Sequence, residues 1–243
     1  LALIPYRQIA ERGFACVDDG APLLVMTVED HATLPVAEVA AAVPDIPLRV
    51  TGGHFDVDDD TYAATVHRVI ENEIGKGNGA NFVIRRSFVA DITDYSPHSA
   101  LVIFRRLLRS ESGAYWTFIV HTGERTFVGA TPERHITLRD GIAVMNPISG
   151  TYRYPQAGPD LPGLLDFIAN QKETEELYMV LDEELKMMAR ICEQGGRVTG
   201  PHLREMARLA HTEYFIQGTT RRDVREILRE TMFAPTVTGS PLE

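Results

Sequence analysis

The sequence predicts an α+β fold made of a single domain. Four short runs rich in β-forming residues follow one another between Tyr115 and Ile148, and the short Gly and Asp turns between them imply antiparallel pairing. The second half changes to helical patterns and does not alternate strands with helices. No linker rich in Pro, Ser or Gly divides the 243 residues, of which 44% are hydrophobic. We therefore expect one α+β domain over residues 1–243.

Caps and apolar stripes mark the elements of the first half. A helix should begin at Asp60, an acidic cap, and end at the glycines of residues 75–77. Its apolar stripe consists of Tyr62, Val66, Val69, Ile70 and Ile74. A strand rich in Phe, Val and Ile is expected over residues 81–91, and Ser96 with Pro97 caps a second helix after it.

The later elements follow from the same signals. Strands are expected over residues 115–121, 125–128, 134–138 and 142–148. Residues 146–151 then form a small, flexible turn. Three helices are expected over residues 164–168, 173–192 and 222–229.

Composition and charge exclude several classes of protein. The net charge of -10 argues against nucleic-acid binding, and the Gly-rich phosphate-loop and dinucleotide motifs are missing. Cys16 and Cys192 are too few for a disulfide framework, and no apolar run approaches the roughly 20 residues that span a bilayer. We expect a cytoplasmic protein without a membrane partner. The start at Leu1 and the turn-like residues 238–243 suggest a domain that is incomplete at both ends.

Three carboxylates lie along one face of the predicted helix over residues 173–192. Glu173, Glu176 and Glu183 recur at helical spacing, so their charges repel unless water or a cation intervenes. A solvated acidic face is one interpretation. The other is a Mg²⁺ site, because Mg²⁺ prefers oxygen ligands and commonly takes one or two protein carboxylates together with an anionic substrate.

Two further segments carry candidate site residues. Glu133 lies between two predicted strands, either paired with Arg134 as an ordinary turn carboxylate or presented to a cleft as a general acid. His211, flanked by apolar residues, is either a satisfied core or surface histidine or a site residue. The turn that contains Gly150 and Thr151 offers N–H groups and a hydroxyl that could hold a carboxylate.

The order of these segments resembles the chorismate-utilising enzymes, the family of anthranilate, aminodeoxychorismate, isochorismate and salicylate synthases. The motifs that carry the resemblance are FVGATPE at 127–133, PISGT at 147–151, KETEEL at 172–177 and APTVTGSP at 234–241. Residues 146–155, 176–192 and 206–214 are most similar to the phenazine-pathway branch, which makes 2-amino-2-desoxyisochorismate. The resemblance implies a chorismate-binding domain built as a sandwich of two antiparallel sheets flanked by helices.

The resemblance also implies roles for particular residues. Glu133 is similar to the general acid that protonates the C4 hydroxyl of chorismate, and Glu176 to a Mg²⁺ ligand, with Glu173 completing the shell of the metal. Gly150 and Thr151 resemble the turn that contacts the substrate. His211 falls where the family has a histidine beside the ring, implicated in the loss of pyruvate.

One position separates amination from hydroxylation. Family members that add water at C2 resemble one another in a Lys base where this chain has Asn81. Water needs such a base, whereas ammonia already has a reactive lone pair. Two departures from anthranilate synthases, GTYRY at 150–154 and Leu242 in place of a Lys, also point to the phenazine-type branch.

These implications predict an enzyme that aminates chorismate at C2 with Mg²⁺ and keeps the enolpyruvyl group. Ammonia would come from a glutaminase, fused or separate, because no nucleophilic Cys motif for glutamine hydrolysis occurs here. One alternative is an anthranilate synthase large subunit, which also eliminates pyruvate. Another is a non-catalytic binding module of the same family. The oligomeric state stays open, with a homodimer as one option.

Overall fold

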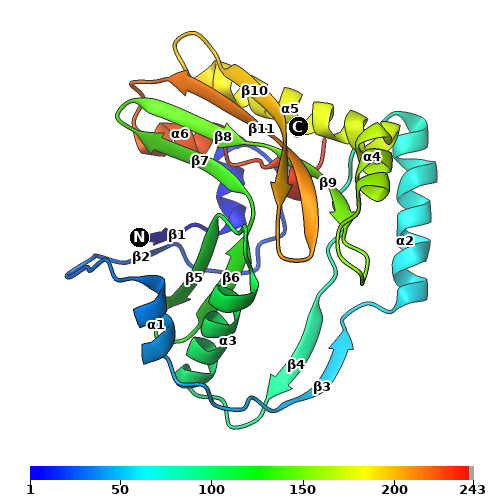
Figure 1. The fold of residues 1–243 in the computed structure, drawn as a ribbon. Helices are drawn as coiled ribbons and strands as arrows, with labels where there is room; N and C mark the ends of the chain where they lie inside the picture. The colour runs from blue at the N-terminus through cyan, green and yellow to red at the C-terminus, as the bar shows by residue number, and fades with distance from the viewer. Residues whose placement is uncertain (241–243) are drawn as a thin grey trace.

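The fold is α+β, as the sequence predicts, and all its named strands pair antiparallel. The computed structural model describes residues 1–240, so Leu242 lies outside the described residues. Figure 1 shows a five-stranded sheet with helices behind it in the upper half of the molecule. The lower half consists of two-stranded ribbons and the helices beside them.

The five-stranded sheet is organised around one long strand, β11 (Leu209–Thr219). Its first half pairs with β9 (Ile148–Arg153) and its second half with β8 (Ile142–Asn146). Pro147 separates β8 from β9, since proline has no N–H for the sheet ladder. The outer strands are β10 (Arg197–Glu205) beside β11 and β7 (Arg134–Arg139) beside β8.

Helix α5 (Gln171–Ile191) covers one face of this sheet. The Asn170 side chain caps it by accepting a hydrogen bond from the N–H of Glu173 at 3.2 Å. Its apolar side packs against the sheet, and the buried core there includes Met145, Met187, Met188, Ile191 and Ile216. Burying each such side chain contributes about 1.5–3 kcal/mol, so this contact fixes α5 over β9 and β11.

The lower half supports the turn that carries Glu133. Strands β5 (Trp116–His121) and β6 (Thr126–Thr131) form a hairpin that packs on α3 (Pro97–Ser110). The chain then turns at Pro132 and Glu133 and enters β7 of the upper sheet. This turn therefore lies where the two halves of the molecule meet (Figure 1).

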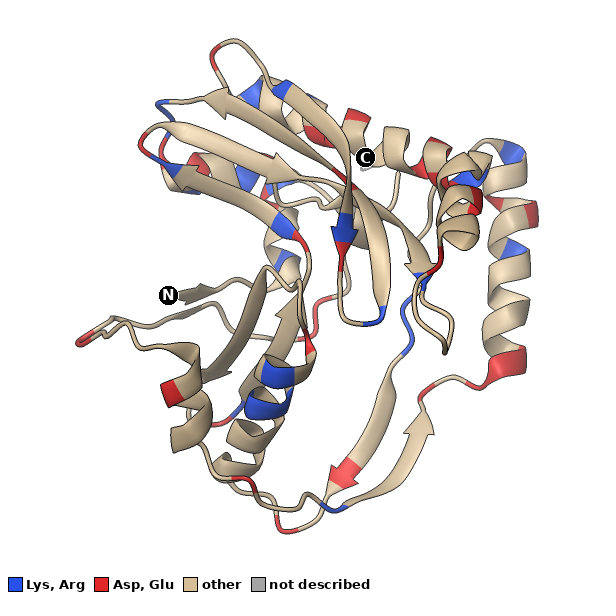
Figure 2. Ribbon diagram, viewed as in Figure 1, with Lys and Arg blue, Asp and Glu red and all other residues tan. Residues whose placement is uncertain are grey.

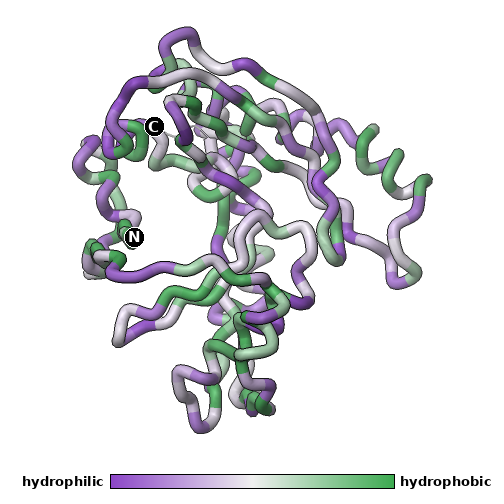
Figure 3. The backbone as a smooth tube through the Cα atoms, turned by 60° about the vertical axis from the view of Figure 1, so that its left-hand side comes forward, coloured by the Kyte–Doolittle hydropathy of each residue, from purple (hydrophilic) through white to green (hydrophobic). Residues whose placement is uncertain are grey.

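The remaining elements belong to these two halves or lie beside them. They are β1 (Ala2–Leu3), η1 (Tyr6–Arg12), β2 (Leu24–Val25), α1 (Val36–Ala42), β3 (Val50–Phe55), α2 (Asp59–Asn72), η2 (Ile74–Lys76), β4 (Phe88–Ile92), α4 (Leu161–Ala169), α6 (Val224–Glu230) and α7 (Pro235–Thr238). Lys and Arg are spread over several elements with one group on α3 (Figure 2), and hydrophobic and hydrophilic stretches alternate along the chain (Figure 3). Among residues 1–240, no helix has both the length and the apolar character needed to cross a bilayer.

Several predicted elements are confirmed. Ser96 begins α3 with a capping box, and α5 extends over almost the whole predicted range. The cap of α2 is Asp58, two residues before the predicted Asp60, and its side chain accepts from the N–H of Thr61 at 2.8 Å. Gly77, with a left-handed φ of 76°, ends η2 after that helix.

Two predictions of local structure were wrong, and two strands were not predicted. The strand expected over residues 81–91 is confined to β4, because only Phe88–Ile92 finds a partner in β3. Residues 146–151 are not a turn, since Ile148–Arg153 forms β9 against β11. Strands β10 and β11 were not predicted, because only the second half's helical patterns were recognised.

Candidate functional site

The predicted site residues lie along α5 in two groups. The first group surrounds the N-terminal end of α5 and includes Glu173, Gly150 and His211. The second group lies at the turn between β6 and β7, where Glu133 meets α7. Helix α5 contacts both β9 and α7, so one helix joins the two groups.

His211 is held against the predicted substrate turn. It lies at a register shift between Ala210 and Thr212 in the pairing of β11 with β9. The Nδ1 atom lies 2.5 Å from the carbonyl oxygen of Gly150 and 3.5 Å from the hydroxyl of Thr151. Because a carbonyl oxygen only accepts, Nδ1 is the donor in the hydrogen bond to Gly150.

Gly150 allows the carboxylate of Glu173 to approach the backbone. Its φ is 67°, and a Cβ atom at this position would lie 2.7 Å from Glu173 Oε2 and 3.0 Å from the ring of Phe167. Glu173 Oε2 is buried and has no hydrogen-bond partner among the described residues. Glycine is thus required both by the left-handed backbone and by the contact.

Replacing Gly150 by Ala should lower the free energy of unfolding by more than the about 1–2 kcal/mol expected for left-handed strain alone. Urea unfolding measures this loss. Gly195→Ala is the matched control, because Gly195 has a φ of 73° and nothing within 4 Å of its would-be Cβ. Equal losses in the two variants would show that the contact with Glu173 has no energetic consequence.

The ammonium group of Lys172 lies between the carboxylates of Glu173 and Glu176. The Nζ atom of Lys172 lies 3.1 Å from Glu173 Oε1 and 2.6 Å from Glu176 Oε2. Hydrogen bonding to Glu176, and then to Glu173, raises the pKa of Lys172. The Lys172 side chain is 70% exposed, so it can leave this position without breaking the core.

The two carboxylates fit a site for Mg²⁺. They lie one helical turn apart, and the buried, unpartnered Glu173 Oε2 is an oxygen that a metal or its water could satisfy. Within residues 1–240, no group of three or more His, Cys, Asp or Glu side chains could hold a metal. The described residues therefore supply a pair of carboxylates and not a complete ligand set.

Glu183 does not belong to this pair. Its Oε1 atom accepts hydrogen bonds from Lys186 Nζ at 3.1 Å and from the hydroxyl of Ser240 at 3.2 Å. The predicted acidic face is thus divided, with Glu173 and Glu176 around Lys172 and Glu183 further along the helix. Figure 2 shows acidic residues at several places along α5.

Glu133 is a partly buried carboxyl group without a cationic partner among the described residues. The Thr236 hydroxyl of α7 lies 3.2 and 3.1 Å from its two carboxyl oxygens, and the Glu133 N–H donates to Thr131 Oγ1 at 3.2 Å. Burial raises the pKa of Glu133, and the hydrogen bond from Thr236 partly opposes this rise. A carboxyl group that keeps its proton to higher pH than an exposed glutamate does is suited to general acid catalysis.

Arg134 does not pair with Glu133 as the alternative interpretation required. Its guanidinium lies over the rings of Tyr115 and Phe215, at 5.1 and 5.5 Å from their centroids. These are cation–π distances. Glu133 and Arg134 therefore point into different environments although they are adjacent in sequence.

Asn81 anchors the C-terminal segment by its backbone. Its N–H donates to the carbonyl of Ser240 at 3.2 Å, and the Ser240 N–H donates to the carbonyl of Asn81 at 2.9 Å. The side-chain amide lies 3.4 Å from the carbonyl of Pro235. Asn81 thus holds the segment that also carries Thr236, the partner of Glu133.

Glu184 is a buried acid on α5 that the sequence reasoning missed. It is 1% exposed, and neither carboxyl oxygen has a hydrogen-bond partner among the described residues. Burial, and then the neighbouring charge of Glu133, raise the pKa of Glu184 well above its ordinary value. Its helical spacing to Val180 and Met188, which places an acid on the apolar face of α5, is the signal that could have identified it.

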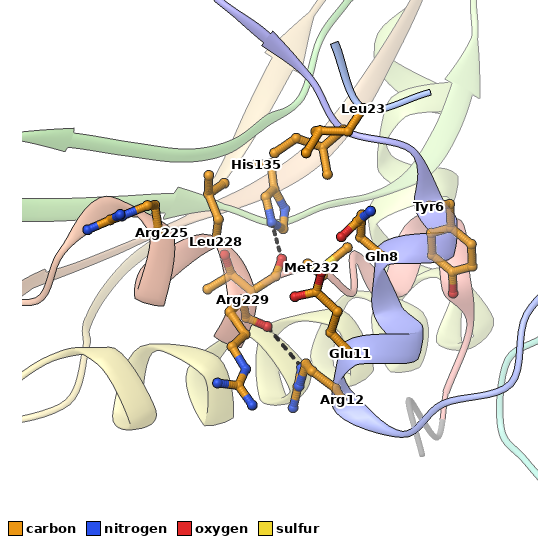
Figure 4. A pocket seen from close by; sticks show the side chains of 12 residues that line it. Tyr6, Gln8, Glu11, Arg12, Leu23, His135, Arg225, Leu228, Arg229 and Met232 are labelled. Carbon is orange, nitrogen blue, oxygen red and sulfur yellow. Dashed lines mark hydrogen bonds between the residues drawn. The ribbon is translucent and has the colours of Figure 1, made fainter. Parts of the chain in front are cut away.

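A separate pocket lies between η1 and α6, outside both groups (Figure 4). Its volume is about 530 Å³, and two hydrogen bonds join residues of its wall. The His135 ring nitrogen Nε2 bonds the carbonyl of Thr231, and Arg12 Nη1 donates to the carbonyl of Arg229 at 3.2 Å. None of the predicted site residues lines this pocket.

Sequence comparisons relate the chain to enzymes that bind chorismate. The sequence profile of the chorismate binding enzymes matches residues 40–243. The phenazine-specific anthranilate synthases of Pseudomonas chlororaphis and Pseudomonas fluorescens are each 65% identical over all 243 residues of this chain. The chain spans 38% of the length of each of these relatives.

Solved structures share the fold. Anthranilate synthase component I from Streptococcus pneumoniae superposes with a TM-score of 0.66 at 22% identity, covering 81% of this chain and 42% of that chain. The menaquinone-specific isochorismate synthase of Escherichia coli gives a TM-score of 0.70 at 18% identity, covering 82% of this chain and 46% of that chain. At these identities the superpositions show a common fold and leave the reaction to be argued from the site.

Proposed function

Because the chain belongs to the family of chorismate-binding enzymes, we propose that it forms part of a synthase that aminates chorismate at C2. The identity of 65% to phenazine-specific anthranilate synthases, over the whole chain, is the observation that carries this proposal. Asn81, in place of the Lys base of the water-adding members, supports ammonia as the nucleophile. The predicted product is 2-amino-2-desoxyisochorismate.

The reaction requires one acid from this chain. As the bond from nitrogen to C2 forms, the ring double bonds shift and the bond from C4 to its hydroxyl breaks. Glu133 gives its proton to the departing hydroxyl, which leaves as water, and the new ammonium group loses a proton to restore the balance. The partial burial and raised pKa of Glu133 support this role, and Thr236 fixes the orientation of its carboxyl group.

Glu173 and Glu176 are the residues that would hold Mg²⁺. When bound, the ion neutralises the carboxylates of the substrate, which would otherwise be repelled by an acidic chain with a net charge of -10. Gly150 and Thr151, bonded to His211, place backbone and hydroxyl groups beside the carboxylate pair, where they would contact the substrate. Ammonia would come from a glutaminase that is fused to the chain or separate from it.

The product distinguishes this proposal from its rivals. The full-length protein, given chorismate, Mg²⁺ and an ammonium salt, should form an aminated product that keeps the enolpyruvyl group, as mass spectrometry would show. Free pyruvate in stoichiometric yield would indicate an anthranilate synthase, which eliminates pyruvate from the same intermediate. Binding of chorismate without any turnover would indicate a non-catalytic module.

A further inference from the structure

Pro147 interrupts the hydrogen-bond ladder between β11 and its two neighbours, β8 and β9. The register is the same on both sides of this proline, so Tyr214 of β11 lies directly opposite it. The N–H of Tyr214 donates to the carbonyl of Pro147 at 3.0 Å. Two residues that face each other in this way in an antiparallel pair normally exchange two hydrogen bonds. The second bond, to the carbonyl of Tyr214, cannot form here because proline has no N–H.

The side chain of Asn146 supplies the missing donor. Its Nδ2 atom lies 2.8 Å from the carbonyl oxygen of Tyr214. Both residues are buried, and a buried carbonyl group without a partner is costly. The amide of Asn146 therefore replaces, in the ladder, the N–H that residue 147 lacks.

Glu213 and Arg204 hold the amide of Asn146 in this orientation. The Nδ2 atom of Asn146 also lies 3.2 Å from Glu213 Oε2, and Glu213 is only 5% exposed. A carbonyl oxygen and a carboxylate both accept, so the nitrogen of the amide and not its oxygen must face them. Arg204 Nη1 lies 3.9 Å from the same carboxylate, and Arg204 Nη2 donates to the carbonyl of Gly113 at 2.7 Å. The buried carboxylate of Glu213 thus has a hydrogen-bond donor and a cation beside it.

The interrupted ladder lies directly before the segment that is predicted to contact the substrate. After Pro147 the pairing of β9 with β11 resumes, and the hydroxyl of Thr212 donates to the carbonyl of Ser149 at 2.8 Å. The next carbonyl along β9, that of Gly150, accepts from His211 Nδ1. A shift of β9 along β11 would therefore displace both the backbone of Gly150 and the ring of His211.

We propose that Asn146 is a positioning residue for chorismate binding. By replacing the missing N–H of Pro147, it keeps β9 in register with β11 and so places Gly150 and Thr151 where the substrate binds. This inference rests on the proposed function, in which Gly150 and Thr151 contact chorismate. The proposed acid and metal ligands lie on other elements, so a change at Asn146 should affect binding of chorismate more than the chemical step.

A double-mutant cycle in the full-length protein tests this role. Asn146→Ala should raise the KM for chorismate by about 10-fold, the scale of one buried hydrogen bond, while kcat changes by less than about 3-fold. Pro147→Ala restores a backbone N–H at this position, so in that background the substitution of Asn146 should raise KM by less than about 3-fold. Asn72→Ala, at an exposed position of α2, is the control and should change neither value.

Two outcomes of this cycle would overturn the inference. An equal rise of KM in the two backgrounds would mean that Asn146 does not act in place of the missing N–H. A lower melting temperature with an unchanged KM would mean that Asn146 contributes to stability alone.

Amide hydrogen exchange gives a readout that does not depend on turnover. In the double variant Asn146→Ala/Pro147→Ala, the new N–H of residue 147 should exchange slowly, because it then donates to the carbonyl of Tyr214. Fast exchange at this position would refute the inference even if the parent protein converts chorismate. If this N–H is protected but the parent protein does not convert chorismate, the proposed function is refuted and the role of Asn146 in the ladder is not.

Discussion

Replacing Glu133 by Gln should lower kcat by about 10²-fold to 10⁴-fold, the range expected for loss of a general acid, while chorismate still binds. The amide has nearly the size of the acid and can still accept from Thr236, so the fold around the turn should be retained. What it lacks is a transferable proton. Steady-state kinetics with ammonium as the nitrogen source, together with a direct measurement of chorismate affinity, would separate the loss of chemistry from a loss of binding.

The activity should depend on pH in a direction set by the pKa of Glu133. Burial raises the pKa of Glu133, so the protonated and active form extends to higher pH than it would for an exposed glutamate. Activity should therefore be present at pH values below that pKa and fall as the pH rises through it, and Glu133→Gln should lack this limb. Glu124→Gln, on the exposed turn between β5 and β6, should keep both the kcat of the parent protein and the fall of activity at high pH. An unchanged kcat in Glu133→Gln would remove the acid assignment.

The parts of the fold that were predicted are those with local signals. Helices α3 and α5 have caps and apolar periodicity in their own sequence, so Ser96 and the run from Glu173 were sufficient to indicate them. Strands β10 and β11 depend on partners: β11 pairs with β8 and β9, more than 50 residues earlier in the chain. The strand expected from residue 81 fails for the same reason, since a strand requires a neighbour as well as β-forming residues.

The site was predicted as a set of residues but not as a geometry. The motifs pointed to Gly150 and Glu173 separately, yet the backbone of one touches the carboxylate of the other only because α5 packs on β9. Asn81 was expected to bear on the choice of nucleophile, and the structure adds that its backbone anchors the segment after α7. Glu184 was overlooked because it stands among other acids, although its helical spacing to Val180 and Met188 places it on the apolar face of α5.

The carboxylate pair on α5 should control the response to Mg²⁺. Removing the ion with a chelator should abolish turnover, and Glu176→Gln should raise the Mg²⁺ concentration for half-maximal activity by at least about 10-fold to 100-fold, the range for residues that only support metal ligands. Titrating each variant with Mg²⁺ at saturating chorismate measures this change. Glu175→Gln is the control, because Glu175 is exposed and bonds Gln171 on the same helix.

Lys172 should also affect the response to Mg²⁺, since its ammonium group lies between the same two carboxylates. A cation that occupies this position competes with a metal for Glu173 and Glu176, so Lys172→Met should lower the Mg²⁺ concentration for half-maximal activity, opposite to the effect of Glu176→Gln. Substitution of a surface residue without a role in metal binding would leave the Mg²⁺ concentration for half-maximal activity unchanged. If both substitutions shift the Mg²⁺ response in the same direction, Lys172 supports the site and does not compete for it, and the carboxylates must bind the metal in another arrangement.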